Sequence, residues 1–196
     1  MTTQISIDAA KRAMRTDMDR VRSALSAARC ETGAGMLKET GLSFAAPSSR
    51  AIISGYAAIG TELNLWPLLE MLAASGHPIA LPVTVGKGAP LIFRTWKPET
   101  PLKTGAFCVP VPDENSPELE PEILLVPLLA FDKKGFRLGY GAGFYDRTLA
   151  RLRAHGSVTA IGIAFDEQQV EAVPHDAYDE ALDWMLTPSG PIKIER

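Results

Sequence analysis

The stretch that decides the fold is residues 122–147, EILLVPLLAFDKKGFRLGYGAGFYDR. It begins with Glu122–Pro127, a short and mostly apolar run, as in a strand buried on both faces of a parallel sheet. A loop rich in glycine and charge follows, and residues 144–154 then have helical spacing, with Leu149 and Leu152 on one apolar side. This order of strand, loop and helix predicts an α/β unit, and ligands of such units bind beyond the carboxyl ends of the strands.

The rest of the chain, read outward from this stretch, alternates between strand and helix patterns. We expect a helix over residues 65–74. Further strands are expected at residues 51–57, 79–85, 91–96, 160–165 and 184–187. This alternation implies a three-layer α/β/α domain with a largely parallel, Rossmann-like sheet. The pattern leaves the order of the strands in the sheet open.

The N-terminal segment predicts a long amphipathic helix over residues 6–31 that packs on this domain, so that residues 1–196 form a single domain. Its apolar stripe consists of Met14, Met18, Val21, Leu25 and Ala28. Four basic residues lie off that stripe: Lys11, Arg12, Arg15 and Arg22. Gly33 and Gly35 predict a break, with a short second helix after it.

Composition narrows the class of protein. The formal net charge is -3, from 20 basic and 23 acidic residues, which argues against a nucleic-acid or membrane-surface binder. Cys30 and Cys108 form no C-x-x-C pair and are too few for a disulfide framework. The start lacks the apolar run of a signal peptide, and no apolar stretch is long enough to span a membrane. We therefore expect a cytoplasmic protein, and no obligate protein partner is evident.

The glycine-rich loop carries the densest functional signal. Gly139, Gly141 and Gly143 alternate, which lets the backbone approach a ligand and present N–H groups to phosphate oxygens. The following helix N-terminus also favours an anion, and Arg137 adds a forked cation. The spacing differs from the dinucleotide-binding fingerprint, and the chain contains no P-loop motif.

Taken whole, residues 123–147 resemble the signature of the 5-formyltetrahydrofolate cyclo-ligase family. The matching residues are Phe131, Asp132, Gly135, Arg137, Leu138, Gly139, Gly141, Gly143, Tyr145 and Asp146. Phe144 replaces the first of two tyrosines of the family pattern, and Ala142 stands where some members have a lysine. The resemblance implies the fold of the sugar-phosphate isomerases and CoA transferases.

The same resemblance implies an ATP site with two parts. Lys11 and Arg15, with Arg12 between them, are similar to the Lys-x-x-x-Arg of the family, whose cations bind ATP phosphates. The glycine loop supplies the rest: Arg137, Leu138, Gly139, Tyr140, Gly141, Ala142, Gly143, Phe144 and Tyr145. Of these, Arg137 and Tyr145 are the expected catalytic residues.

The folate and the metal are also assigned through the resemblance. It implies that Ala57, Glu62 and Tyr140 bind the folate. Asp146 and Asp179 are the expected ligands of Mg²⁺, with Asp183 as the competing candidate for the second position.

The implied reaction is the ATP-dependent cyclisation of 5-formyltetrahydrofolate to 5,10-methenyltetrahydrofolate, with release of ADP and phosphate. It proceeds through phosphorylation of the formyl oxygen and attack by N10. Two alternatives remain from the sequence. One is another enzyme on a related α/β fold, such as a sugar-phosphate isomerase or CoA transferase, and the other is a folate- or nucleotide-binding module without turnover.

Overall fold

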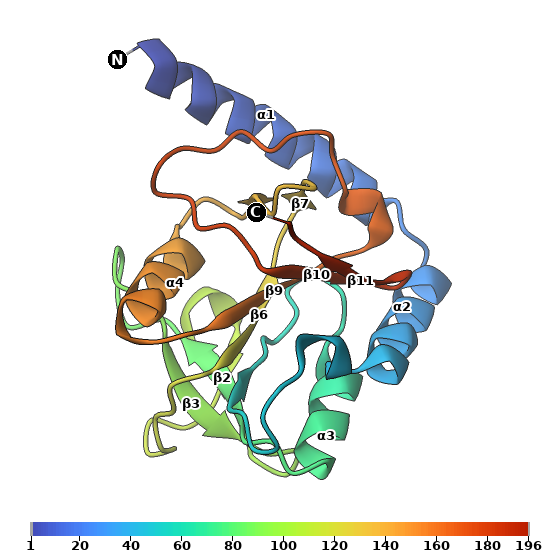
Figure 1. Cartoon of the computed structure of the whole chain (residues 1–196), viewed down its shortest axis with the longest axis vertical. Helices are drawn as coiled ribbons and strands as arrows, with labels where there is room; N and C mark the ends of the chain where they lie inside the picture. Colours follow the sequence, from blue (N-terminus) through green and yellow to red (C-terminus); the bar gives the residue numbers. More distant parts are fainter. Residues whose placement is uncertain (1, 196) are drawn as a thin grey trace.

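The computed structural model describes residues 2–195, with side chains from residue 7 onward, and a central sheet organises them (Figure 1). Within this range the sheet has seven strands, in the order β11 (Gly190–Lys193), β10 (Trp184–Thr187), β9 (Thr159–Ile163), β6 (Ile123–Pro127), β1 (Ile53–Ser54), β2 (Ile79–Val83) and β3 (Ile92–Trp96). The five strands from β10 to β2 are mutually parallel, whereas β3 and β11 are antiparallel edges. The predicted α/β fold with a largely parallel sheet is confirmed.

Helices cover both faces of the sheet. In the described chain they are α2 (Ala27–Thr40) and α3 (Trp66–Ala74) on one face and α4 (Phe144–His155) on the other (Figure 1). Alternate residues of β6 face opposite layers, as strand geometry requires. Leu125 joins the core cluster that contains Leu68 of α3, whereas Leu124 joins the cluster that contains Leu149 of α4. Both faces of the central strands are therefore buried, which explains their continuous apolar runs.

The predicted N-terminal helix over residues 6–31 is wrong in its bounds, because the segment forms two helices. Helix α1 spans Thr2–Ser23, and α2 begins after Ser26, whose hydroxyl accepts a hydrogen bond of 3.1 Å from the backbone N–H of Arg29. The predicted break at Gly33 lies inside α2. A Cβ on Gly33 would meet Leu63 at 3.1 Å, so this glycine serves close packing rather than helix termination.

The buried face of α1 also differs from the predicted stripe. Met18 is buried against the hairpin β7 (Ala130–Phe131) and β8 (Arg137–Leu138), but Val21 is 38% exposed and Arg22 only 3% exposed. The helix is turned so that Arg22 rather than Val21 faces inward. This orientation is possible because the buried Arg22 finds hydrogen-bond partners in Thr61 and Tyr140.

The loop after β6 is more ordered than its glycine content suggests. Asp132 is buried, and its carboxylate accepts hydrogen bonds from the backbone N–H groups of Lys134, Phe136 and Val173. Gly135, at φ +84°, has no room for a Cβ, which would lie 2.8 Å from the carbonyl oxygen of Leu182. These contacts close the β7–β8 hairpin, so this part of the motif builds the loop rather than binding a ligand.

One further hairpin, β4 (Lys103–Thr104) with β5 (Pro110–Val111), lies in the proline-rich segment after β3.

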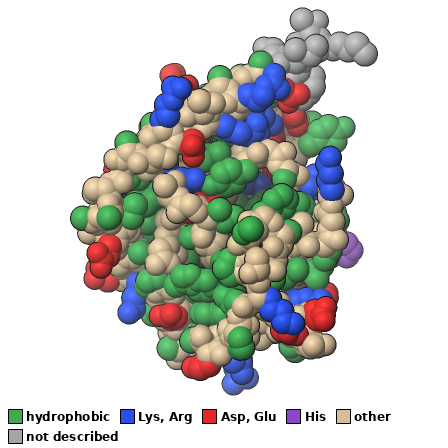
Figure 2. All heavy atoms as spheres, turned by 180° about the vertical axis from the view of Figure 1, so that it is seen from behind, with side chains coloured by type: hydrophobic (Ala, Val, Ile, Leu, Met, Phe, Trp, Pro, Cys, Tyr) green, Lys and Arg blue, Asp and Glu red, His purple; other side chains and the backbone are tan. Residues whose placement is uncertain are grey.

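Figure 2 shows hydrophobic side chains gathered in the lower half of the face drawn there, among charged side chains of both signs. In residues 2–195, no helix combines the length and the apolar character that crossing a bilayer requires.

Candidate active site

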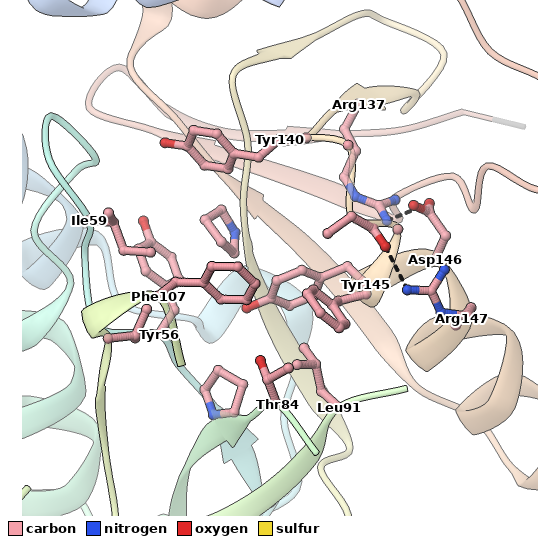
Figure 3. A pocket seen from close by; sticks show the side chains of 18 of the residues that line it. Tyr56, Ile59, Thr84, Leu91, Phe107, Arg137, Tyr140, Tyr145, Asp146 and Arg147 are labelled. Atoms are coloured by element: carbon pink, nitrogen blue, oxygen red, sulfur yellow. Dashed lines mark hydrogen bonds and ion pairs between the residues drawn. The ribbon is translucent and has the colours of Figure 1, made fainter. Parts of the chain in front are cut away.

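A cavity of about 870 Å³ lies where several carboxyl ends of strands meet. Pro127 ends β6, Val83 ends β2 and Ala57 follows β1, and all three line the cavity. Helix α1, the glycine loop, the start of α4 and the β4–β5 hairpin complete its wall. Figure 3 shows the side chains of Tyr56, Phe107, Tyr140 and Tyr145 around it. The position agrees with the rule that ligands of open α/β sheets bind at this edge.

Basic side chains from α1 reach the glycine loop. Arg15 Nε donates a hydrogen bond of 2.9 Å to the carbonyl oxygen of Gly139. Gly141 adopts φ +100°, and a Cβ there would lie 3.2 Å from the Arg15 guanidinium carbon, so glycine permits this approach. Lys11 lines the same cavity and pairs with Asp179 at 2.6 Å. One wall therefore combines cations with a glycine-rich loop of backbone amides, a combination suited to phosphate.

Two carboxylates lie on the same side of the cavity. Asp146 Oδ1 accepts hydrogen bonds from Arg137 Nη2 at 2.7 Å and from the backbone N–H of Glu180 at 3.2 Å (Figure 3). Asp179 Oδ2 accepts from Lys11 and, at 2.7 Å, from the backbone N–H of Asp176. The described residues contain no group of three acidic, cysteine or histidine side chains that could hold a metal by themselves. Two carboxylates nevertheless fit Mg²⁺, which takes most of its remaining ligands from phosphates and water.

Arg137 acts mainly as an anchor in this arrangement. Its side chain is only 5% exposed, and besides Asp146 it donates to the carbonyl oxygen of Glu180. Burial lowers the pKa of Arg137, an effect that the nearby carboxylates of Asp146 and Asp179 oppose. The guanidinium thus joins the β8 strand, the start of α4 and the segment that carries Asp179.

Glu62 and tyrosines form another part of the cavity wall. Glu62 Oε2 accepts a hydrogen bond of 2.8 Å from the backbone N–H of Ile59. Burial raises the pKa of Glu62, whereas the Ile59 hydrogen bond, the charge of Arg22 and the hydroxyl of Tyr140 lower it. Burial raises the pKa of Tyr145 far above its ordinary value, so its hydroxyl stays protonated and can donate.

Phe107 is the most unusual aromatic residue of the cavity. It is 73% exposed, yet it lines the cavity and lies edge-on to Phe144, with 6.3 Å between ring centres. Its φ is +57° and that of Cys108 is +58°, a conformation that side chains other than glycine rarely adopt. The β4–β5 hairpin therefore holds Phe107 in a strained backbone, as residues at ligand sites often are.

Comparison with known sequences assigns the family. The sequence model of the 5-formyltetrahydrofolate cyclo-ligase family matches residues 7–188. The 5-formyltetrahydrofolate cyclo-ligase of Haemophilus influenzae is 32% identical over 174 residues, which cover 86% of this chain and 92% of that protein. This chain belongs to the 5-formyltetrahydrofolate cyclo-ligase family. The cyclo-ligase of Escherichia coli K12 is 36% identical over 133 residues, 65% of this chain and 72% of that protein.

Solved structures agree with the cyclo-ligase fold. The 5,10-methenyltetrahydrofolate synthetase of Aquifex aeolicus superposes with a TM-score of 0.74 at 25% identity, covering 95% of this chain and 93% of that one. The synthetase of Mycoplasma pneumoniae superposes with a TM-score of 0.71 at 24% identity, covering 91% and 98%. At 24% identity, the likeness to the Mycoplasma pneumoniae protein shows a shared fold and nothing more.

The structure gathers nearly all of the residues that the cyclo-ligase resemblance implied. Those that line the cavity are Lys11, Arg15, Ala57, Glu62, Arg137, Leu138, Gly139, Tyr140, Gly141, Ala142, Gly143, Phe144, Tyr145, Asp146 and Asp179. Arg12 is exposed and outside this lining, because adjacent residues of a helix point about 100° apart and Lys11 faces inward. Asp183 also lies outside it and binds Arg153 and the backbone N–H of Ala160.

Several residues in or next to this cavity were missed from the sequence, and three of them bear on the argument. Arg147 lines the cavity and donates to the carbonyl oxygen of Ala142 at 2.6 Å, and its place directly after Asp146 was an available signal. Arg22 lies seven positions after Arg15, on the same helix face, which also was visible in the sequence. Phe107 had no signal, because only the hairpin geometry brings it to the cavity.

Proposed function

We propose that this member of the cyclo-ligase family converts 5-formyltetrahydrofolate and ATP to 5,10-methenyltetrahydrofolate, ADP and phosphate. The observation that supports it most is a single cavity that joins a cationic, glycine-rich wall to a buried acid. Lys11, Arg15 and the glycine loop supply the first, and Glu62 among tyrosines supplies the second. A nucleotide and a substrate with hydrogen-bond donors can therefore meet in one site.

The chemistry explains why ATP is needed. An N-formyl oxygen is a poor leaving group, and transfer of the γ-phosphoryl group to it produces a good one. N10 of the folate then attacks the electrophilic formyl carbon, and the C–O bond breaks as phosphate departs. The ring is closed with one ATP converted to ADP and phosphate.

Positioning and charge stabilisation are the main demands of phosphoryl transfer. Lys11 and Arg15 would bind phosphate oxygens together with the backbone N–H groups of the glycine loop. The first turn of α4 adds further N–H groups, since no side chain among the described residues caps it. Tyr145, kept protonated by burial, would donate a hydrogen bond to the formyl or phosphate oxygen. Arg137 would hold Asp146 in place rather than contact substrate directly.

Mg²⁺ is the second cofactor of the proposal. Asp146 and Asp179 would hold it, because both are hard oxygen ligands on the phosphate wall. When bound, the ion would neutralise charge on the transferring phosphoryl group. Lys11 would have to leave Asp179 for a phosphate as this happens.

Glu62, Ala57 and Tyr140 would bind the folate. A carboxylate suits the N–H donors of a pteridine ring, and Phe107 offers a face on which a flat ring can stack. We also propose that the protein works in the cytoplasm without an obligate partner, a location that suits the two free thiols, Cys30 and Cys108, of the described chain.

A cyclisation assay tests the proposal. The purified protein should convert 5-formyltetrahydrofolate to the methenyl product, followed by its near-ultraviolet absorbance, in the presence of ATP and Mg²⁺ together and not when either is omitted. ADP and phosphate should appear in equal amounts with the product. Binding of folate without turnover under these conditions would contradict the proposal and favour a binding module.

A further inference from the structure

Arg22 is a buried cation behind the Glu62 part of the cavity wall. Arg22 as a whole is only 3% exposed. Nε donates to Thr61 Oγ1 at 2.8 Å and Nη2 to the Tyr140 hydroxyl at 2.5 Å. The guanidinium carbon also lies 5.7 Å from the centre of the Tyr140 ring. Nη1 is buried and has no hydrogen-bond partner among the described residues.

These contacts join three separate segments of the site. Arg22 belongs to α1, Thr61 directly precedes Glu62, and Tyr140 lies between two glycines of the loop. Arg22 is itself outside the cavity lining, whereas Glu62 and Tyr140 line it. A guanidinium is costly to bury unless it is hydrogen-bonded, and α1 leaves the apolar Val21 exposed while it buries Arg22. Packing alone therefore does not account for this side chain.

We propose that Arg22 is a positioning residue, which holds Glu62 and Tyr140 in the arrangement that binds the folate. The inference rests on the proposed function, in which Glu62 contacts that substrate. Thr61 and Tyr140 transmit the effect, because each is hydrogen-bonded to the guanidinium. Thr61 is adjacent to Glu62, and Tyr140 lies between two glycines of the loop. Folate binding is thereby linked to the same helix that offers Lys11 and Arg15 to the nucleotide.

Charge gives the proposal a readout that a structural role would lack. Four groups act on the Glu62 carboxyl or lie beside it: Arg22 from α1, Tyr56 after β1, Tyr140 from the glycine loop and Tyr145 from α4. Burial raises the pKa of Glu62, and the positive charge of Arg22 opposes that rise. Without this charge the pKa of Glu62 should rise further, so that more of it is protonated at a given pH.

The experiment compares Arg22→Met with Arg22→Lys in steady-state kinetics of the full chain. Arg22→Met should raise the KM for 5-formyltetrahydrofolate by roughly 10-fold or more, as expected for lost charge-assisted contacts, and change the KM for ATP much less. The acid limb of the pH profile of kcat/KM for the folate should move to higher pH. Arg22→Lys should keep that limb near its original pH, since it retains the charge. Arg20→Met, an exposed cation of the same helix, is the matched control and should alter neither KM.

Two results would overturn the inference. One is an equal rise of both KM values with an unmoved pH limb, which would mean that Arg22 only stabilises α1. The other is unchanged folate kinetics in Arg22→Met. If that variant fails to fold, Tyr140→Phe provides the test, since it keeps the ring and loses the hydroxyl that Arg22 binds; an unchanged folate KM there counts against the inference.

Glu62→Gln separates this inference from the proposed function. If Glu62→Gln leaves the folate KM unchanged, the proposed role of Glu62 is wrong, whatever Arg22 does. If Glu62→Gln weakens folate binding, Arg22→Met should cost less in the Glu62→Gln background than alone, because the two residues act together. Full additivity of the two changes would contradict the link between them.

Discussion

Lys11 Nζ lies 2.6 Å from Asp179 Oδ2, although 168 positions separate the two residues in the sequence. Their side chains are only 13% and 19% exposed, so water screens the pair less than it would at the surface. The cation proposed for ATP phosphates and the acid proposed for Mg²⁺ thus neutralise one another. Binding of the magnesium–nucleotide complex should exchange this pair for two new ones, Lys11 with phosphate and Asp179 with the metal.

Loss of either α1 cation should weaken ATP use. Lys11→Ala and Arg15→Ala should raise the KM for ATP and lower kcat/KM about 10- to 150-fold, which corresponds to roughly 1.5–3 kcal/mol for one charge-assisted phosphate contact. Arg15→Ala also loses the hydrogen bond to Gly139, so it should have the larger effect on the loop. Steady-state kinetics at varied ATP concentration measure the KM for ATP and the kcat/KM of each variant.

Arg12→Ala is the control for these variants, because Arg12 is exposed on the same helix and outside the cavity lining. Its ATP kinetics and melting temperature should match those of the unaltered protein. Normal ATP kinetics in Lys11→Ala and Arg15→Ala would instead leave both residues with a structural role only, in the contacts to Asp179 and Gly139.

The two proposed metal ligands should differ in their effect on stability. Asp179→Asn should raise the Mg²⁺ concentration needed for half-maximal rate and lower the melting temperature less than Asp146→Asn does, because Lys11 keeps Asp176 at 3.6 Å. Asp146→Asn should do the same to the rate and also cost about 1.5–3 kcal/mol of stability, because the buried Arg137 loses its charged partner. A magnesium titration of activity and thermal melts of each variant measure the two effects.

Asp183→Asn distinguishes the competing assignment. Asp183 pairs with Arg153 and accepts from Ala160, away from the cavity lining. We expect reduced stability with an unchanged magnesium requirement. A raised requirement in Asp183→Asn, with none in Asp179→Asn, would show that the second metal ligand has been placed four residues too early.

Phe107→Asn should separate backbone strain from ligand contact. Asparagine adopts positive φ more readily than phenylalanine, so the free energy of unfolding should rise by up to about 1 kcal/mol. The lost aromatic contact should raise one substrate KM by roughly 2- to 10-fold, for a stacking contribution of about 0.5–1.5 kcal/mol. Chemical denaturation and kinetics with each substrate varied provide the measurements. Unchanged KM values for both substrates would exclude a ligand contact.

Glu62→Gln should stabilise the protein in a pH-dependent way. The pKa of Glu62 is raised in the folded state above its ordinary 4.5, so the folded state binds the proton more tightly. The charged form therefore costs stability, and this cost grows as pH rises from the ordinary pKa through the raised one. Glutamine can still accept from Ile59 and carries no such cost.

The melting temperature of Glu62→Gln should thus exceed that of the unaltered protein at about pH 8 and match it near pH 4, where both side chains are neutral. Melts across this range measure the difference. A constant difference, or one that shrinks as pH rises, would contradict the raised pKa.

Much of the fold and of the candidate site could be predicted because it depends on local sequence. Ile123–Pro127 is apolar throughout and forms the central strand β6, and Phe144–His155 forms α4 where helical spacing begins. The break in the N-terminal helical segment was predicted at Gly33 but lies before Ser26, because local capping and the packing of distant segments compete in deciding where a helix ends. Ser26 caps α2 locally, but Gly33 stays helical since its missing Cβ admits Leu63 from another segment.

The sequence by itself determined the alternation of strands and helices, the family signature and the chemical identity of the candidate site residues. These follow from side-chain periodicity and from motifs, which short stretches of chain contain in full. Only the tertiary structure decided that Arg22 rather than Val21 faces inward, that Arg12 points away, and that Phe107 reaches the cavity. The reason is physical, because each of these features depends on how α1 and the β4–β5 hairpin pack against the edge of the sheet. Such packing is set by hydrogen bonds and contacts between residues far apart in the sequence. Arg22, for example, binds Thr61 at a separation of 39 positions and Tyr140 at a separation of 118.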